Sequence, residues 1–494
     1  MEKNNSVKAF SLKGLIEQYK NMATPVKASL WFIVCNLIQS GIGVISVPIF
    51  ARMLSTEEYG MFNTFYAWRN ILMIFTSLNL SYGVFNNAMV KYEDSKTRDE
   101  YVSSMEGLYG FITLVIFGIY WLTRGWCNEF LGMTTEVVCL LFVELLCYPA
   151  LLFWSNRQRY EFKYKWLVVV TLLVSIVNLV SGVILVYFSQ NKDLARIRSV
   201  ALTDGIICGG FFIYQLLKGR KLCIPKFWKF ALAFNIPLIP HYLSEMVLTQ
   251  SDRIMIEKYV SATATANYST AYSVATMLQL FMSAINASFL PWAYSCLKHK
   301  KYDDMKKMGV IITVIMCGLI LLMMLFAPEL IFIFAGNKYA DAIYVIPPIA
   351  MSVFFMLMYD LFSTIEFYYG KTVRVMLASI VCASMNVFLN WLLIPRFGYY
   401  VAGYTTLFCY MLYALTHYIL YCKICKEQME NNRCYNEKGL FFISIVMLLL
   451  TIFINIVYKY MLVRYFIVLV VVAAFIWKRD VILNLFKQMK EKKE

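Results

Sequence analysis

Residues 166–188 read WLVVVTLLVSIVNLVSGVILVYF and contain no charged side chain. A transmembrane helix needs about 20 consecutive, mostly apolar residues to cross the hydrocarbon core of a bilayer, and this stretch meets that requirement. Counting this stretch and those on either side of it, the chain contains about 14 stretches of this kind. The expected spans are 28–50, 61–81, 104–123, 136–155, 166–188, 199–217, 230–250, 266–290, 308–334, 344–367, 373–394, 401–421, 440–457 and 463–482. The sequence therefore predicts an all-α polytopic membrane protein.

The placement of the basic residues predicts the orientation of the chain. Of the 494 residues, 60% are hydrophobic and 15% charged, against roughly 45–50% and 25% in soluble domains. The net charge of +16 would suit nucleic acid, but 34 of the 46 Lys and Arg residues fall in alternate gaps, beginning with the N-terminus. Short positively charged loops stay in the cytoplasm. We therefore expect cytoplasmic termini, a basic surface that faces anionic membrane lipids, and no nucleic-acid partner.

Two segments resemble each other at matching topological positions. Residues 52–66 read RMLSTEEYGMFNTFY, and residues 258–272 read KYVSATATANYSTAY. Each segment follows the first span of one half of the chain and enters the second. Such repeated halves are typical of transporters, with the substrate path between them. The predicted organisation is a cytoplasmic segment 1–27, an N-lobe 28–217, a cytoplasmic loop 218–229, a C-lobe 230–421, two further spans with their preceding loop in 422–482, and a basic cytoplasmic tail 483–494.

The seventh expected span carries the most ionisable groups. Residues 234–256 read FNIPLIPHYLSEMVLTQSDRIMI, with His241, Glu245 and Asp252 at positions i, i+4 and i+11. At 100° per residue these three side chains lie within about 40° of one another around a helix. Ionisable groups in hydrocarbon are costly, so they mark either a transport path or buried structural pairs. We read His241 and Glu245 as coupling residues, with a structural interhelical bond as the alternative.

The same span contains two prolines and an acidic–basic pair. Pro237 and Pro240 lack backbone donors and are expected to kink or hinge the helix below the polar stripe. Asp252 and Arg253 lie near the expected external end. Asp252 is a candidate for gating and Arg253 for substrate binding. The alternative is an interfacial anchor or a local ion pair.

Arg69 lies inside the second expected span, about 10 Å from its external end at 1.5 Å per residue. Its guanidinium cannot lose its proton, so it must face water, a carboxylate or an anionic ligand. Tyr66 and Trp68 stand beside it. A guanidinium pairs with phosphate oxygens and aromatic rings pack on sugar faces, so the three residues form a candidate substrate site. The alternative is a buried ion pair with Glu144.

Two further expected spans contain polar side chains. In the first span, Asn36 and Gln39 lie on one helix face, where they either line a cavity or allow close helix packing. In the tenth span, Asp360 and Glu366 are six residues apart and so on different faces. Asp360 is the deeper of the two and the better candidate for a site.

Neither a metal nor a cofactor is predicted. His417, Cys422, Cys425 and Cys434 form the one suggestive cluster, but a single C-x-x-C lacks the second pair that zinc spacing requires. Ordinary apolar cysteines are the better interpretation. The chain also lacks the G-x-x-x-x-G-K-[ST] pattern of ATP hydrolysis.

The seventh span resembles the start of the second lobe in Wzx-type polysaccharide flippases, members of the multidrug, oligosaccharidyl-lipid and polysaccharide exporter superfamily. The family pattern reads P-l-i-P-h-x-l-s and then S-D-R-x-x-I. The matching residues are Pro237, Pro240, His241, Ser244, Ser251, Asp252, Arg253 and Ile256. The first-lobe junction also matches, through Arg52, Leu54, Glu58, Tyr59 and Gly60. The glycine that usually precedes Tyr268 is absent, because Ala266 and Asn267 stand there.

This resemblance implies a two-lobed, V-shaped helical bundle with a central cavity in a bacterial plasma membrane. The implied substrate is an undecaprenyl-diphosphate-linked oligosaccharide, moved from the cytoplasmic to the external leaflet by alternating access for O-antigen or capsule synthesis. The polysaccharide polymerase and chain-length machinery are implied partners. The protein is then a transporter rather than an enzyme. The alternatives are a gradient-driven multidrug or cation antiporter, a flippase for lipid-linked peptidoglycan precursors, and, in another class, a membrane-embedded glycan polymerase or ligase.

Overall fold

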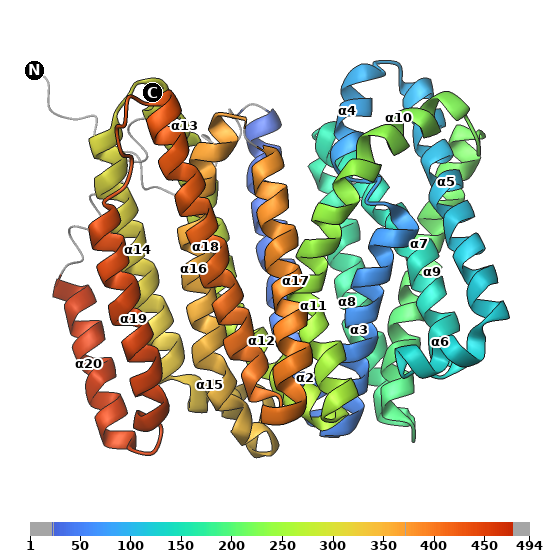
Figure 1. Ribbon diagram of the computed structural model, residues 1–494. Coiled ribbons are helices and arrows are strands. Elements are labelled where there is room, and N and C mark those ends of the chain that lie inside the picture. Colours follow the sequence, from blue (N-terminus) through green and yellow to red (C-terminus); the bar gives the residue numbers. More distant parts are fainter. Residues whose placement is uncertain (1–21, 23, 371, 478–494) are drawn as a thin grey trace, which may run out of the picture. The chain divides into compact units, whose positions relative to one another are not determined.

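The computed structural model describes residues 22, 24–370 and 372–477, and these residues form helices without any strand. The elements in chain order are α2 (Thr24–Met53), α3 (Thr56–Ser77), α4 (Gly83–Lys91), α5 (Ser95–Leu122), α6 (Arg124–Leu131), α7 (Thr135–Tyr160), α8 (Tyr164–Phe188), α9 (Lys192–Gly219), α10 (Pro225–Asn235), η2 (Ile236–Leu238), α11 (Ile239–Tyr259), α12 (Ala262–Ala275), α13 (Leu278–Lys298), α14 (Tyr302–Leu325), α15 (Ala327–Ala335), η3 (Asn337–Val345), α16 (Ile346–Tyr368), α17 (Thr372–Phe397), α18 (Tyr400–Gln428), α19 (Glu437–Val457) and α20 (Met461–Trp477) (Figure 1). The predicted all-α class is confirmed.

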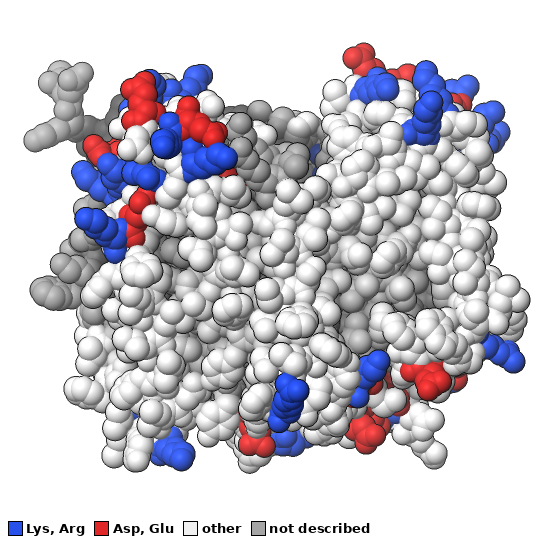
Figure 2. Space-filling model, viewed as in Figure 1, with Lys and Arg blue, Asp and Glu red and all other residues white. Residues whose placement is uncertain are grey.

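Ten of the described helices are long and apolar enough to cross a membrane, or eleven if the bent pair Ala262–Asn286 and Ser288–Lys298 counts as one span. Helices α3 and α11 lie where further spans were expected, but their charged side chains lower their hydropathy. On the face shown in Figure 2, charged side chains gather at the helix ends and leave an uncharged band between them. The expected tail 483–494, residues 1–21 of the N-terminal segment and the last residues of the final span lie outside the described residues.

The described chain divides into two compact units. The first contains residues up to Ser46 and Leu72–Pro237, and the second contains Val47–Ile71 and the residues from Leu238 onward. The chain therefore passes between the units within α2, within α3 and at η2. The lobe boundaries given above stay a prediction.

The core of the first unit is rich in aromatic side chains from α4, α5, α7 and α10. Its fully buried rings are Phe85, Tyr101, Tyr109 and Phe153. Tyr109 stacks on Phe153 with 5.9 Å between ring centroids. The indole of Trp228 on α10 donates a hydrogen bond to the Ser104 carbonyl at 2.9 Å. These contacts dock α10 on the first unit, although the sequence places its last residues in the same expected span as α11.

The prolines of that span separate two helices. Helix α10 ends at Asn235, the 3-10 turn η2 contains Pro237, and Pro240 stands in the first turn of α11. A proline is tolerated in the first turn because its missing N–H has no intrahelical acceptor there. Asn235 also donates to the Leu78 carbonyl at 2.8 Å, which holds the end of α10 in the first unit. A break between helices thus stands where the sequence predicts a kink or hinge.

In the second unit, the two repeated segments contact each other. The hydroxyls of Thr56 on α3 and Thr263 on α12 lie 3.3 Å apart. At Gly60 a Cβ atom would overlap the carbonyl of Ala262, so only glycine permits this approach. The Lys338 ammonium donates a hydrogen bond to the backbone carbonyl of Leu54, in the first repeated segment, at 2.5 Å. These contacts explain why Val47–Ile71 groups with the second unit.

Candidate functional site

A pocket of about 410 Å³ lies inside the second unit. Small-molecule sites typically measure roughly 300–1,000 Å³, so this pocket is large enough for a compact group. Helix α11 supplies one wall, and α13, α16, α17 and α18 supply the others. The lining residues are Leu238, His241, Ser244, Glu245, Leu248, Thr249, Gln279, Met356, Tyr359, Phe367, Met376, Ser379, Tyr410 and Tyr413. We call this the α11 pocket.

The chemistry of the α11 pocket is aromatic and polar. The rings of Tyr359 and Tyr413 stack with 4.6 Å between centroids, and the Tyr413 hydroxyl lies 2.8 Å from the Ser379 hydroxyl. Glu245 is the carboxylate among the lining residues, which include neither Lys nor Arg. The Nδ1 atom of His241 is buried without a hydrogen-bond partner among the described residues. Such walls suit a hydroxyl-rich ligand or, at Glu245, a cation.

An apolar groove of about 610 Å³ adjoins this pocket. It lies between α11 and α17, and its lining includes Pro240, Val247 and Trp391. Ser244 lines both the groove and the α11 pocket. The Ser244 hydroxyl donates to the Pro240 carbonyl at 2.6 Å, so its side chain is held at the junction. A polar site and an apolar site therefore share one wall.

Asp252 does not line the α11 pocket, although the sequence places it on one stripe with His241 and Glu245. Its carboxylate is fully buried and accepts hydrogen bonds from the hydroxyls of Tyr268 and Thr406 and from the Asn390 amide. The Asn390 bond measures 2.6 Å. Three donors compensate a buried charge that would otherwise be costly. The carboxylate joins α11, α12, α17 and α18.

The partners of Asp252 were missed in the sequence. Asn386 and Asn390 are four residues apart on α17, and the Asn390 amide also donates to the Asn386 side-chain oxygen at 3.2 Å. Thr405 donates to the Asn390 oxygen at 2.5 Å. Two asparagines at i and i+4 in an apolar span are a signal of a buried polar network. That signal was available in residues 373–394.

The two arginines singled out from the sequence are both buried. Arg69 is 4% exposed, and its guanidinium lies 5.2 Å from the ring centroid of Tyr66 on the preceding turn of α3. Tyr66 is exposed and Trp68 is half-buried. Arg253 lies over the ring of Tyr272 at 4.5 Å and donates to a backbone carbonyl of its own helix. Neither arginine lines the α11 pocket.

The remaining candidates are dispersed. Asn36 and Gln39 are exposed on the part of α2 that belongs to the first unit. Asp360 follows the pocket residue Tyr359, and its carboxylate accepts a hydrogen bond from Asn286 at 2.7 Å. Asp360 is therefore next to the α11 pocket without being one of its lining residues.

A buried histidine–glutamate pair lies behind the pocket and was not anticipated. His417 Nδ1 is 2.7 Å from Glu366 Oε1, and both side chains are fully buried. The His417 ring is 5.0 Å from the ring of Tyr359. The sequence groups His417 with Cys425 and Cys434, but the structure pairs it with Glu366. Within residues 22, 24–370 and 372–477, no group of three or more His, Cys, Asp or Glu side chains is placed to hold a metal.

The chain matches two family models. The first, described as polysaccharide biosynthesis protein, covers residues 26–297, and the second, MatE, covers residues 237–392. A protein of the Lsg locus of Haemophilus influenzae is 22% identical over 372 residues, 73% of this chain and 89% of that protein. An uncharacterised membrane protein of Methanocaldococcus jannaschii is 22% identical over 453 residues, 84% and 87% of the two chains.

The fold is shared with solved structures of other membrane proteins. The lipid II flippase MurJ, in an inward closed conformation, aligns with a TM-score of 0.67 at 13% identity, over 92% of this chain and 99% of that one. An inward-facing multidrug resistance MATE transporter aligns with a TM-score of 0.59 at 13% identity, over 78% and 93%. At this identity the likeness concerns the fold. The family model covers more than half of the chain, and the resemblance to Wzx-type flippases is confirmed: the chain belongs to the polysaccharide biosynthesis protein family of this exporter superfamily.

Proposed function

We propose that the protein moves undecaprenyl-diphosphate-linked oligosaccharides from the cytoplasmic to the external leaflet of a bacterial plasma membrane. The product would serve the synthesis of O-antigen or capsule. One observation carries the proposal: Ser244 lines both the aromatic, polar α11 pocket and the apolar groove. A lipid-linked sugar needs both surfaces side by side, because its head is rich in hydroxyls and its tail is a hydrocarbon.

Each surface fits one part of such a substrate. Sugars present apolar ring faces and hydroxyl edges, which match the stacked rings of Tyr359 and Tyr413 and the side chains of Ser379 and Gln279. An isoprenoid tail would lie against Val247 and its neighbours between α11 and α17. Neither lining contains a Lys or Arg that could balance a diphosphate, so we assign that group to Arg69, which belongs to the same unit.

One rival function has a specific observation in its favour. Glu245 stands in a lining without Lys or Arg, which would suit a multidrug or cation antiporter. The likeness of the fold to a lipid II flippase also keeps a peptidoglycan precursor in view. The match of the polysaccharide biosynthesis model to residues 26–297 favours the glycan substrate over both.

Transport can be measured in vesicles that contain the purified protein and a fluorescent undecaprenyl-diphosphate glycan. A membrane-impermeant quencher reports the share of the lipid in the outer leaflet. We expect the protein to accelerate exchange between leaflets at least tenfold over empty vesicles, since a polar head crosses hydrocarbon slowly. Efflux of a cationic dye without glycan movement would establish the antiporter instead. Movement of lipid-linked peptidoglycan precursor alone would establish the third function.

We also propose that both termini face the cytoplasm, as the alternating Lys and Arg content predicts. Single cysteines at Ser55, Phe162, Lys301 and Asn337, all exposed residues at helix ends, test this in a cysteine-free background. An impermeant thiol reagent should label positions 55 and 337 in intact cells, and positions 162 and 301 only after permeabilisation. Labelling of 162 or 301 from outside would invert the orientation.

A further inference from the structure

The buried pair of His417 on α18 and Glu366 on α16 contacts two aromatic residues of the α11 pocket. His417 Nδ1 lies 2.7 Å from Glu366 Oε1. The His417 ring is 5.0 Å from the ring of Tyr359 and 4.6 Å from the ring of Tyr413, which it meets at 75°. Tyr359 and Tyr413 line the pocket, whereas His417 and Glu366 do not. The pair therefore supports the aromatic wall without lining the space for a ligand.

A single hydrogen bond fixes the orientation of the His417 ring. Among the described residues, neither His417 Nε2 nor Glu366 Oε2 has a hydrogen-bond partner. Both side chains are 0% exposed, so bulk water cannot supply one. The contact between the two side chains thus determines which face and edge His417 presents to the tyrosines.

The pair is not needed to hold α16 and α18 together. The two helices pack against each other, and both have buried apolar residues, such as Phe354 and Leu357 on α16 and Leu407 and Ala414 on α18. A buried polar or ionic pair often contributes no more stability than apolar side chains of similar volume. An orienting role therefore explains the pair better than a stabilising one.

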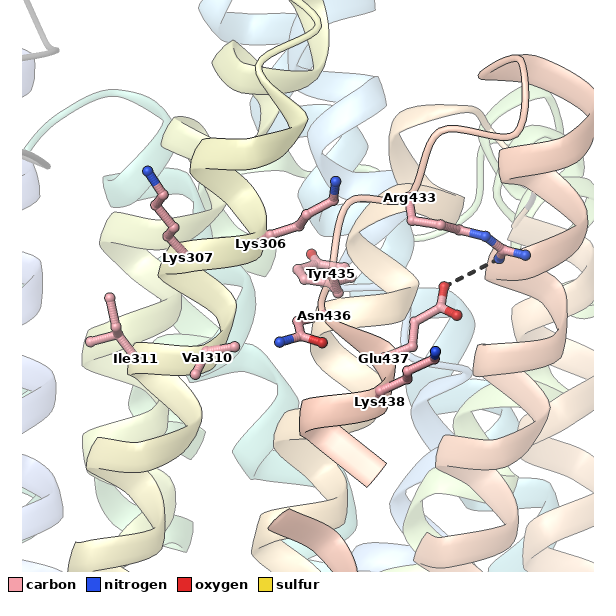
Figure 3. Close-up of a pocket in the computed structure, with 9 residues that line it drawn as sticks. All are labelled: Lys306, Lys307, Val310, Ile311, Arg433, Tyr435, Asn436, Glu437 and Lys438. Atoms are coloured by element: carbon pink, nitrogen blue, oxygen red, sulfur yellow. Dashed lines mark ion pairs between the residues drawn. The ribbon is translucent and has the colours of Figure 1, made fainter. Parts of the chain in front are cut away.

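The surroundings of the pair are also aromatic. Phe362 on α16 and Tyr421 on α18 each lie one helical turn from a member of the pair, with 5.3 Å between their ring centroids, and both pack on Tyr435. The Tyr435 hydroxyl donates to the Leu361 carbonyl of α16 at 2.8 Å. Tyr435 also lines a separate pocket of about 570 Å³ between α14 and the start of α19 (Figure 3). All three rings are buried, and such an environment of low polarity strengthens the hydrogen bond within the pair.

We propose that Glu366 and His417 are positioning residues for the sugar-binding wall of the α11 pocket. This inference rests on the proposed function, because it assumes that Tyr359 and Tyr413 pack on a sugar. Glu366 orients the imidazole, and the imidazole holds the two tyrosine rings in their stack, with 4.6 Å between centroids. Aromatic rings favour a narrow set of mutual geometries. A wall that is held in place before binding loses less entropy when the sugar arrives.

The test compares two lipids that differ only in the sugar: the fluorescent undecaprenyl-diphosphate glycan, and undecaprenyl diphosphate as its competitor. Binding is measured on the purified full-length protein. Glu366→Leu should weaken binding of the glycan lipid about tenfold, because the tyrosines lose their support. The affinity for undecaprenyl diphosphate should not change, since this lipid has no sugar to pack on the wall. Glu366→Gln keeps a hydrogen-bonding group in place and should bind both lipids as the wild type does.

A second variant and a matched control accompany this test. Glu366→Leu leaves a buried histidine without its partner, whereas the double variant Glu366→Leu, His417→Leu leaves no unpaired group and should show the same selective loss. The control is Glu106→Leu in the first unit, where a fully buried carboxylate accepts a hydrogen bond from Gln215 at 2.9 Å. It removes a buried hydrogen bond of the same kind and should leave both affinities unchanged. Melting temperatures report the folding of every variant.

Several outcomes would overturn the proposal. Equal weakening for both lipids, or unfolding of the double variant as well, would assign the pair to the stability of the fold. An unchanged affinity of the double variant for the glycan lipid would show that the tyrosines keep their places without the pair. In each of these cases the wild type prefers the glycan lipid. A wild type that binds both lipids equally would instead refute the sugar-binding role of the α11 pocket, and the inference would fail with it.

Discussion

Replacing Arg69 by alanine is expected to leave the protein folded and inserted but to abolish glycan export. Arg69 is 4% exposed and lies within α3, so its permanent charge sits where water is scarce. The diphosphate of the proposed substrate is the group that most needs a fixed cation. Hydrogen bonds to charged groups contribute about 1.5–3 kcal/mol each, which corresponds to about a tenfold to hundredfold loss of affinity when one is removed.

The conservative variant separates charge from geometry. Arg69→Lys keeps the positive charge but lacks the planar fork that binds two phosphate oxygens at once. It also changes the contact with the Tyr66 ring at 5.2 Å. We expect it to recover only part of the activity. Transport is measured in the same vesicle assay, and surface polysaccharide in cells gives an independent readout.

A matched control is available in the first unit. Arg198 is about half exposed and pairs with Glu136 on the surface, and surface ion pairs contribute little to stability. Arg198→Ala should therefore export normally. Normal export by Arg69→Ala, at an abundance equal to wild type, would assign the diphosphate to another cation.

The membrane spans could be predicted because a long apolar run is visible in the sequence itself, without knowledge of the other helices. Long apolar runs such as Tyr164–Phe188 can be recognised directly, and each of the ten described helices that are long and apolar enough to cross a membrane overlaps an expected span. The contact between the repeated segments was not predicted. Their similarity suggested symmetry, but only the structure shows that Gly60 lies against Ala262. Close approach of two backbones depends on helix crossing, which a local pattern does not encode.

The candidate site was less predictable, since partners on other helices decide what a polar residue does. The angular position around the helix axis placed Asp252 on one stripe with Glu245. The side chains that surround the two carboxylates nevertheless differ. Asp252 meets donors from α12, α17 and α18, whereas Glu245 faces a pocket. His417 shows the same limit. Its glutamate partner is 51 positions away on another helix, and no spacing rule links the two.

Replacing Glu245 by glutamine is expected to uncouple transport from the proton gradient. Uphill transport needs a second ligand whose binding differs between the two conformations. A proton bound at Glu245 or His241 can serve as that ligand, because both side chains can take up a proton and both residues line one pocket. If one proton moves per cycle, a gradient of one pH unit supports up to about a tenfold accumulation, since one unit corresponds to about 1.4 kcal/mol.

Wild-type vesicles should lose that accumulation when the gradient is dissipated. The Glu245→Gln variant should show no accumulation under any gradient, while downhill exchange continues, because glutamine keeps the size of the side chain and removes the titrating group. The control Glu129→Gln changes an exposed residue of α6 and should behave as wild type.

Two results would separate coupling from a structural role. If wild-type transport ignores both proton and sodium gradients, coupling is refuted, and His241 and Glu245 serve only as hydrogen-bonding groups between helices. In that case Glu245→Gln should lower the melting temperature, and transport by the variant should be as independent of the gradients as transport by the wild type. A variant that melts as wild type yet loses accumulation assigns Glu245 to the coupling step, because the site then changes the energetics of transport without changing those of folding.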